Sequence, residues 1–151
     1  MLSLSLFSCN AREQDPPADL IGSEELSFTV DTLATGLENP WSMAFLPDGR
    51  ILIAERPGRL RIVRDGVLDP NPIEGLPTML SAGIAGLTDI VLDPDFATNR
   101  TLYLSYSKAA PGEEGKPPPQ TNSTLAVLRA KWDGGARLTE VEDIFVATPW
   151  Y

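Results

Sequence analysis

The chain has 151 residues, of which 42% are hydrophobic, and its formal net charge is −9. This length and hydrophobic content are enough for one ordinary domain. The negative charge repels polyanions and no basic stripe offsets it, so composition argues against a nucleic-acid partner. Glycine and proline contribute 12 and 14 residues, an excess that favours many turns between short strands.

The first residues resemble the end of a bacterial lipoprotein leader. Cys9, the only cysteine, follows the apolar run Leu6-Phe7-Ser8, so we expect residues 1–9 to be a truncated leader with Cys9 as the lipid attachment site. Residues 10–27 are polar and acidic, which predicts a flexible tether. No stretch is long enough for a transmembrane helix, so membrane attachment would depend on that lipid. These features predict a bacterial protein that is exported, periplasmic or lipid-anchored at the cell envelope.

From residue 28 onward the pattern predicts short β-strands separated by turn residues. Pro70 and Pro72 confine one of these strands to a sheet edge. Arg59 and Arg61 alternate with apolar residues, which predicts that both face solvent. In chain order, the expected strands cover 28–34, 41–45, 51–55, 60–63, 67–73, 87–92, 102–107, 125–132 and 138–147.

The predicted strands fall into two repeats of one pattern. Aligning Pro47-Asp48 with Pro94-Asp95 gives a separation near the ~40–50 residues of a four-stranded propeller blade. We therefore expect an all-β fold of the β-propeller type, with its first strand and about two blades in residues 28–151. A two-sheet sandwich is the alternative. Two blades leave apolar faces uncovered, so we expect the chain to be the N-terminal fragment of a longer protein.

Two stretches resemble a known family. They are the run GLENPWSMAFLPDGR at 36–50 and the run GLTDIVLDPDFATNRTLYLSY at 86–106. Both are similar to the PQQ-dependent soluble aldose sugar dehydrogenases, the glucose/sorbosone dehydrogenase group. The resemblance implies a six-bladed propeller that binds pyrroloquinoline quinone (PQQ) and Ca²⁺. It also implies oxidation of the anomeric hydroxyl of a small-molecule aldose, with electrons passing to an external acceptor.

The resemblance also bears on which site residues the chain contains. The family's catalytic histidine follows the segment that matches Thr148-Pro149, and this chain has no histidine. We therefore expect no catalytic residue here and an inactive fragment. The family commonly has a glutamine that can bind the quinone in a Gly-Gln-Gly-Gly-Leu loop. Gly83, Ile84 and Ala85 occupy that cofactor-binding loop, although Ile84 has no polar group to offer.

The order of strands in a blade places four loops on one face. These are the loops around 38–41, 55–58 and 83–86 and the long insertion at 108–121. Asp93 and Asp95 fall on the opposite face, where we expect them to cap a turn. The sequence is also compatible with two alternative functions. One is a non-catalytic sugar-binding or scaffold propeller that has lost quinone binding. The other is a calcium-dependent lactonase-like propeller, for which the candidate ligands are Glu38, Asn39 and Glu55.

Overall fold

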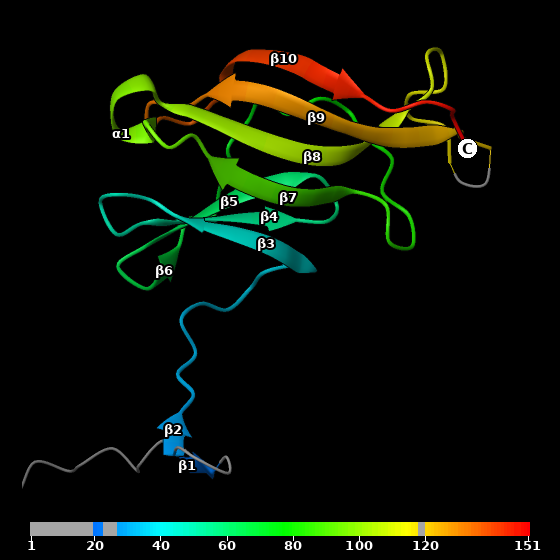
Figure 1. Ribbon diagram of the computed structural model, residues 1–151. Coiled ribbons are helices and arrows are strands. Elements are labelled where there is room, and N and C mark those ends of the chain that lie inside the picture. The colour runs from blue at the N-terminus through cyan, green and yellow to red at the C-terminus, as the bar shows by residue number, and fades with distance from the viewer. Residues whose placement is uncertain (1–19, 23–26, 118–119) are drawn as a thin grey trace, which may run out of the picture. The chain divides into compact units, whose positions relative to one another are not determined.

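The structure is a computed structural model that describes residues 20–22, 27–117 and 120–151 (Figure 1). The predicted leader, with its lipid site at Cys9, lies outside the described residues, as does most of the predicted tether. The chain divides into two units, Met1–Thr32 and Leu33–Tyr151. In the first unit, strand β1 (Leu20–Gly22) pairs antiparallel with strand β2 (Ser27–Thr29).

The second unit contains two four-stranded antiparallel sheets (Figure 1). The first sheet has the order β3-β4-β5-β6, formed by Pro40–Phe45, Ile51–Glu55, Arg59–Arg64 and Val67–Leu68. The second has the order β7-β8-β9-β10, formed by Leu87–Leu92, Thr101–Ala109, Ser123–Lys131 and Thr139–Val146. Each sheet follows chain order from one edge to the other, as a propeller blade does. The all-β prediction is confirmed.

The two sheets pack face to face around one apolar core. Their first strands, β3 and β7, lie side by side, and the Ser42 hydroxyl donates to Asp89 Oδ1 at 2.5 Å between them. Trp132 is almost completely buried in this core. Burial of this apolar surface is the main favourable free-energy contribution to the packing of the two sheets. Leucines of both sheets are almost completely buried in the shared core, among them Leu52, Leu60, Leu87, Leu102, Leu104 and Leu128.

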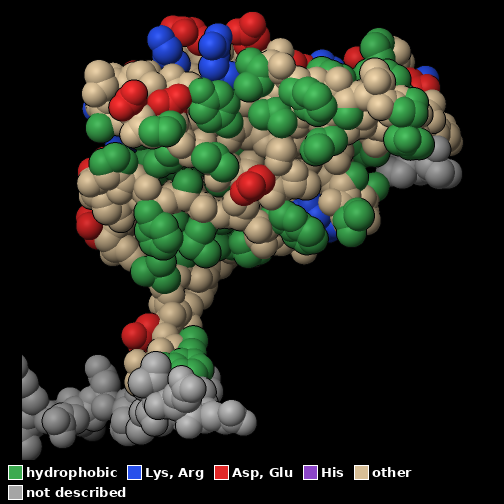
Figure 2. All heavy atoms as spheres, in the orientation of Figure 1, with side chains coloured by type: hydrophobic (Ala, Val, Ile, Leu, Met, Phe, Trp, Pro, Cys, Tyr) green, Lys and Arg blue, Asp and Glu red, His purple; other side chains and the backbone are tan. Residues whose placement is uncertain are grey.

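The outward faces of the two sheets carry exposed apolar side chains. On the first sheet, Ala34 and Leu37 cover part of the face, but Phe45 is 68% exposed. On the second sheet, Val91 and Phe145 are each about half exposed. Figure 2 shows hydrophobic side chains gathered on the side of this unit turned to the viewer. Such faces are expected of blades that pack against further blades.

Three sequence predictions about strands and turns are wrong in part. Strand 28–34 ends at Thr29, because alternation makes a strand only where a partner is present, and Ala34 packs against the first sheet instead. Strand 67–73 ends at Leu68, because two prolines lack the N–H that pairing needs, and Ile73 returns only as an isolated bridge. The turn after β7 continues into a one-turn helix, α1 (Phe96–Asn99), which buries Phe96.

Candidate functional site

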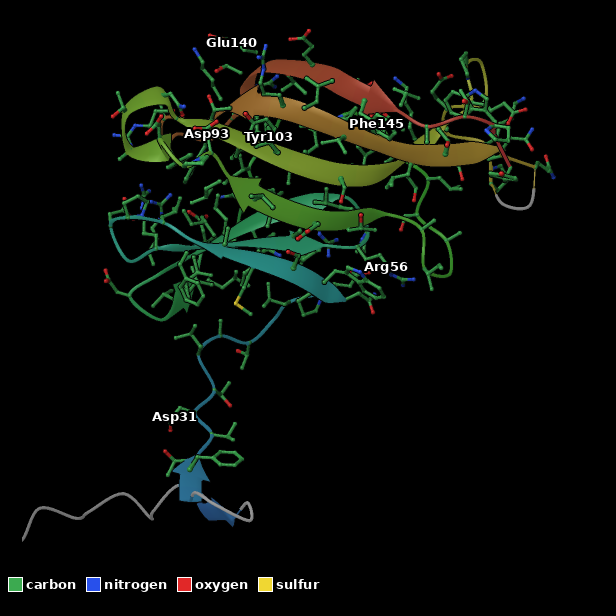
Figure 3. All side chains as sticks on the ribbon, viewed as in Figure 1. Asp31, Arg56, Asp93, Tyr103, Glu140 and Phe145 are labelled. Atoms are coloured by element: carbon green, nitrogen blue, oxygen red, sulfur yellow. The ribbon has the colours of Figure 1, made fainter. Side chains whose placement is uncertain are left out.

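Three loops meet at one edge of the two sheets, and we call this edge the site face. It comprises the loop before β3, the β4–β5 turn at Arg56–Gly58 and the loop Gly83–Gly86 before β7. The Arg56 N–H donates to Asn39 O at 3.0 Å, and Leu87 N–H donates to Arg56 O at 3.0 Å. Figure 3 labels Arg56 at this edge. The predicted grouping of these loops on one face is therefore confirmed.

Gly86 allows the two blades to approach closely at the site face. A Cβ atom at this position would lie 2.1 Å from Arg56 O and 2.7 Å from Arg56 Cγ. The φ angle of Gly86 is 149°, a value that L side chains rarely adopt. The peptide of Gly86 is also held on its other side, because Ser107 N–H donates to Gly86 O at 2.9 Å. Glycine is required here for both space and backbone conformation.

The loop Gly83–Ala85, which the sequence assigns to cofactor binding, is an exposed turn on the site face. Ala85 N–H donates to Ala82 O at 2.8 Å and closes the turn. Ile84 is 83% exposed, so its apolar side chain projects from the tip. No atom lies within 4 Å of a Cβ built on Gly83, so space is open beside the turn. The structure thus presents the loop openly, and its role in cofactor binding stays a prediction.

The long insertion between β8 and β9 folds back on itself beside the site face. Ala110 N–H donates to Asn122 O at 2.8 Å at its base, and Glu113 Oε2 accepts from Asn122 N–H at 2.6 Å. The insertion lies next to the segment that leads into Gly83, as predicted, because Leu80 N–H donates to Ser107 O at 3.0 Å and both segments line one cavity. Residues of both segments, among them Leu80, Ser81, Lys116 and Thr121, line a cavity of about 230 Å³.

Glu55, a candidate metal ligand from the sequence, is instead a buried partner of arginines. It is 0% exposed. Its Oε1 accepts from Glu38 N–H at 2.6 Å, and its Oε2 accepts from Arg59 Nε at 2.6 Å. Arg61 Nη1 lies 3.4 Å from both oxygens. Arg59 Nη2 also donates to Glu38 Oε2 at 2.7 Å. Over the described ranges, no group of three or more His, Cys, Asp or Glu residues could hold a metal ion.

The prediction that Arg61 faces solvent is wrong, since it is only 8% exposed. Alternation along one strand could not show the buried carboxylate on the neighbouring strand. Arg61 Nη2 also donates to Asp69 O at 2.9 Å. Burial alone would raise the pKa of Glu55, but the Glu38 N–H, Arg59 and Arg61 outweigh it and hold this pKa below its ordinary value.

Arg56 is the site-face residue that the sequence analysis did not single out. Its Nε is buried and has no hydrogen-bond partner among the described residues, a feature it shares with Arg61 Nε. None of the ion pairs found within those residues involves its guanidinium. The available signal was a tight turn with charged residues on both sides, from Glu55 to Arg59. That signal could not show that Arg59 and Arg61 pair with Glu55 while Arg56 does not.

The opposite edge of the sheets carries the acidic turns. Asp93 Oδ1 accepts from Asp95 N–H at 2.9 Å and from Asn99 Nδ2 at 2.8 Å, and Asp93 Oδ2 accepts from Tyr103 Oη–H at 2.9 Å. The Asp95 N–H, Asn99 and Tyr103 together lower the pKa of Asp93. Figure 3 labels Asp93 and Tyr103 near this turn. The predicted turn-capping role is confirmed for Asp93, whereas Asp95 makes no side-chain cap to α1.

Residues 37–151 match the family model described as Glucose / Sorbosone dehydrogenase. The chain belongs to the glucose/sorbosone dehydrogenase family. It is 48% identical over 135 residues to an uncharacterised protein of Synechocystis, covering 84% of this chain and 30% of that protein. It is 43% identical over 91 residues to the aldose sugar dehydrogenase YliI of Escherichia coli, covering 60% of this chain and 24% of that enzyme. The chain thus spans less than a third of these relatives.

Solved structures place this glucose/sorbosone dehydrogenase family member among propeller-type sugar dehydrogenases. A crystal structure of a glucose dehydrogenase matches with a TM-score of 0.71 and 39% identity, covering 81% of this chain and 34% of that one. A PQQ-bound aldose sugar dehydrogenase from Streptomyces coelicolor matches with a TM-score of 0.67, 24% identity and coverage of 89% and 36%. At that identity the second match bears on the fold alone. The predicted propeller-type fold is confirmed, and the number of blades in the intact protein stays a prediction.

Proposed function

We propose that the intact protein is a PQQ-dependent aldose sugar dehydrogenase and that this chain is its N-terminal part. In this proposal, residues 28–151 contribute the first strand and the first two blades of a six-bladed ring. Family membership supports the proposal, as do the relatives that are described as sugar dehydrogenases. The structural observation that carries it is the meeting of three loops at the site face through the Arg56 peptide.

The residues at the site face fit an anionic planar cofactor in charge and in space. Among the described residues, Arg59 pairs with Glu38 and Glu55, Arg61 pairs with Glu55, and Arg56 pairs with neither, so these three arginines and two glutamates carry one net positive charge. The rest of the chain is strongly acidic, which makes this local excess distinctive. PQQ is an aromatic polycarboxylate, and space beside the Gly83–Ala85 turn is open to it.

This chain supplies binding and orientation rather than proton transfer. PQQ, when bound, supplies a two-electron acceptor for oxidation of the sugar's anomeric carbon. The proton of the anomeric hydroxyl needs a base, and none of the 151 residues is a histidine. We therefore place the catalytic histidine elsewhere in the intact protein. The Glu55 carboxylate is hydrogen-bonded to Arg59 and Arg61. We therefore assign the proposed Ca²⁺ ligands to other blades.

The exposed Ile84 favours a second candidate function. A glutamine at this position can donate to a quinone oxygen, whereas isoleucine offers only apolar surface. A non-catalytic sugar-binding or scaffold propeller would keep the fold without that contact. The calcium-dependent lactonase-like alternative has less support, because Glu38 and Glu55 are both bonded to Arg59.

The predicted leader at residues 1–9 supports a proposal for the cellular setting. We propose export to the periplasm, or lipid anchoring through Cys9 at a bacterial cell envelope, with residues 10–27 as the tether. In the portion of the chain that the structure describes, no helix has the length and hydropathy to span a membrane. A small-molecule aldose and an external electron acceptor are the partners we propose.

Reconstitution of the full-length gene product tests the proposed function. Purified protein loaded with PQQ and Ca²⁺ is expected to reduce an artificial dye when aldoses are added, and omission of PQQ should abolish this. A folded protein that binds no PQQ and oxidises no aldose in a broad panel would support the scaffold alternative. Hydrolysis of lactones that requires Ca²⁺ and is independent of PQQ would support the lactonase alternative and contradict the proposal.

A further inference from the structure

Of the three arginines near the site face, Arg56 is the one that forms no ion pair among the described residues. Glu55 and Glu38 both bond to Arg59, at 2.6 and 2.7 Å, and Glu55 also lies 3.4 Å from Arg61. Arg61 makes a second bond to a backbone carbonyl. The carboxylates of Glu38 and Glu55 are therefore paired with Arg59 and Arg61. The unbalanced positive charge belongs to Arg56.

The side chain of Arg56 starts from a fixed position. Its N–H and its carbonyl oxygen are bonded to Asn39 and Leu87, so both loops of the site face hold its backbone. Its Cγ lies above Gly86, close to where a Cβ of that residue would be. Its Nε is buried without an acceptor among the described residues; Arg61 Nε is too, but the other nitrogens of Arg61 are bonded to Glu55 and to Asp69 O, whereas Arg56 makes no such bond. A buried N–H that lacks a partner is unfavourable, so an acceptor that reached it would be stabilised.

We propose that Arg56 is the residue of this chain that binds a carboxylate of the cofactor, and that Ile84 contributes only apolar contact to the cofactor. The inference rests on the proposed function and adds a specific ligand to it. A guanidinium presents a planar set of donors that matches a carboxylate and forms short, charge-assisted hydrogen bonds. The charge of Arg56 thereby supplies affinity that the apolar residue at position 84 does not.

Equilibrium titration with PQQ, without any sugar, tests this assignment on the full-length protein. We expect Arg56→Gln to weaken PQQ binding about 10- to 100-fold. Arg56→Lys keeps the charge but loses the planar set of donors. Its affinity for PQQ should therefore lie between those of the wild type and Arg56→Gln. The matched control is Arg64→Gln. Arg64 lies at the other end of β5, is 41% exposed and pairs with Asp69 at 3.8 Å, so its removal should leave PQQ affinity unchanged.

Salt dependence provides a second readout of the same contact. Raising the salt from about 50 mM to about 500 mM should weaken binding more in the wild type than in Arg56→Gln, because screening acts on the charge that the variant lacks. Thermal melting shows whether each variant is folded. If Arg56→Gln does not fold, the PQQ affinity of Arg56→Lys provides the test. Wild-type affinity in the folded Arg56 variants would overturn the assignment alone. Absence of PQQ binding by the wild type would overturn the proposed function and the assignment with it.

Discussion

We expect Gly86→Ala to lower the free energy of unfolding of the full-length protein by about 3 kcal/mol. The added Cβ would meet Arg56 O at 2.1 Å, and a backbone oxygen cannot rotate away. The loop before β7 and the β4–β5 turn would have to separate, which breaks the bond from Leu87 N–H to Arg56 O. Because the same oxygen joins the two blades, the substitution should also weaken PQQ binding. Urea unfolding followed by tryptophan fluorescence measures the first effect.

Gly49→Ala is the matched control for Gly86→Ala. Gly49 also has a positive φ, 85°, but no atom lies within 4 Å of a Cβ built there. It therefore carries only the conformational penalty, about 1 kcal/mol. The Gly49→Ala protein should also bind PQQ as the wild type does, since its turn lies at the other edge of the sheets. Equal losses of stability in the two variants would show that the close approach at Gly86 has no energetic importance.

The second large effect is expected for Glu55→Gln, at about 3 kcal/mol of lost stability at neutral pH. Glutamine keeps an oxygen that can accept from Glu38 N–H but removes the charge. Arg61, which is 8% exposed, then remains buried without its ionic partner. An uncompensated buried charge is costly. The measurement is chemical unfolding of both proteins at about pH 7.

The pH dependence of stability separates the loss of charge from a packing defect. The pKa of Glu55 in the folded protein lies below the ordinary glutamate value of 4.5. Its ionised form therefore adds stability that is fully present above about pH 4.5 and is lost as the pH falls through the lower folded value. Glu55→Gln should flatten this part of the profile. An unchanged profile in the variant would contradict the role assigned to the carboxylate.

Glu140→Gln provides the surface control. Lys131 and Glu140 form an ion pair at 3.2 Å, but their side chains are 46% and 64% exposed. Solvent-exposed pairs of this kind contribute less than about 1 kcal/mol. The contrast between Glu55 and Glu140 tests whether burial, rather than pairing as such, decides the importance of a carboxylate here.

The sequence predicted the elements whose signals are local. Strands β4 and β7 have the predicted bounds, because each is an apolar run limited by strong turn residues. Alternation at 28–34 failed as a guide, since a strand also needs a neighbour with which to pair. For Arg61 the pattern indicated exposure, because the carboxylate that allows its burial lies on another strand. Local patterns thus predicted most strands but not the contacts between them.

For the candidate site, too, the sequence predicted the positions of the loops but not the contacts between side chains. The topology of a blade was sufficient to predict that the loops around Asn39, Arg56 and Gly86 share one face, and their hydrogen bonds confirm it. Among the described residues the guanidinium of Arg56 forms no ion pair, whereas those of Arg59 and Arg61 do, and this difference could not be predicted. It depends on which arginine reaches Glu55, and this is decided by the β4–β5 register, in which Glu55 lies opposite Arg59.

A crystal structure of the full-length protein with PQQ bound tests the central claim most directly. The claim is that the site face of these two blades, joined through Arg56 and Gly86, forms part of the cofactor site. The predicted result is a PQQ carboxylate within hydrogen-bond distance of the Arg56 guanidinium, with the cofactor beside the Gly83–Ala85 turn. PQQ bound at the opposite edge, near the turn that Asp93 caps, or bound only by other blades, would contradict the claim.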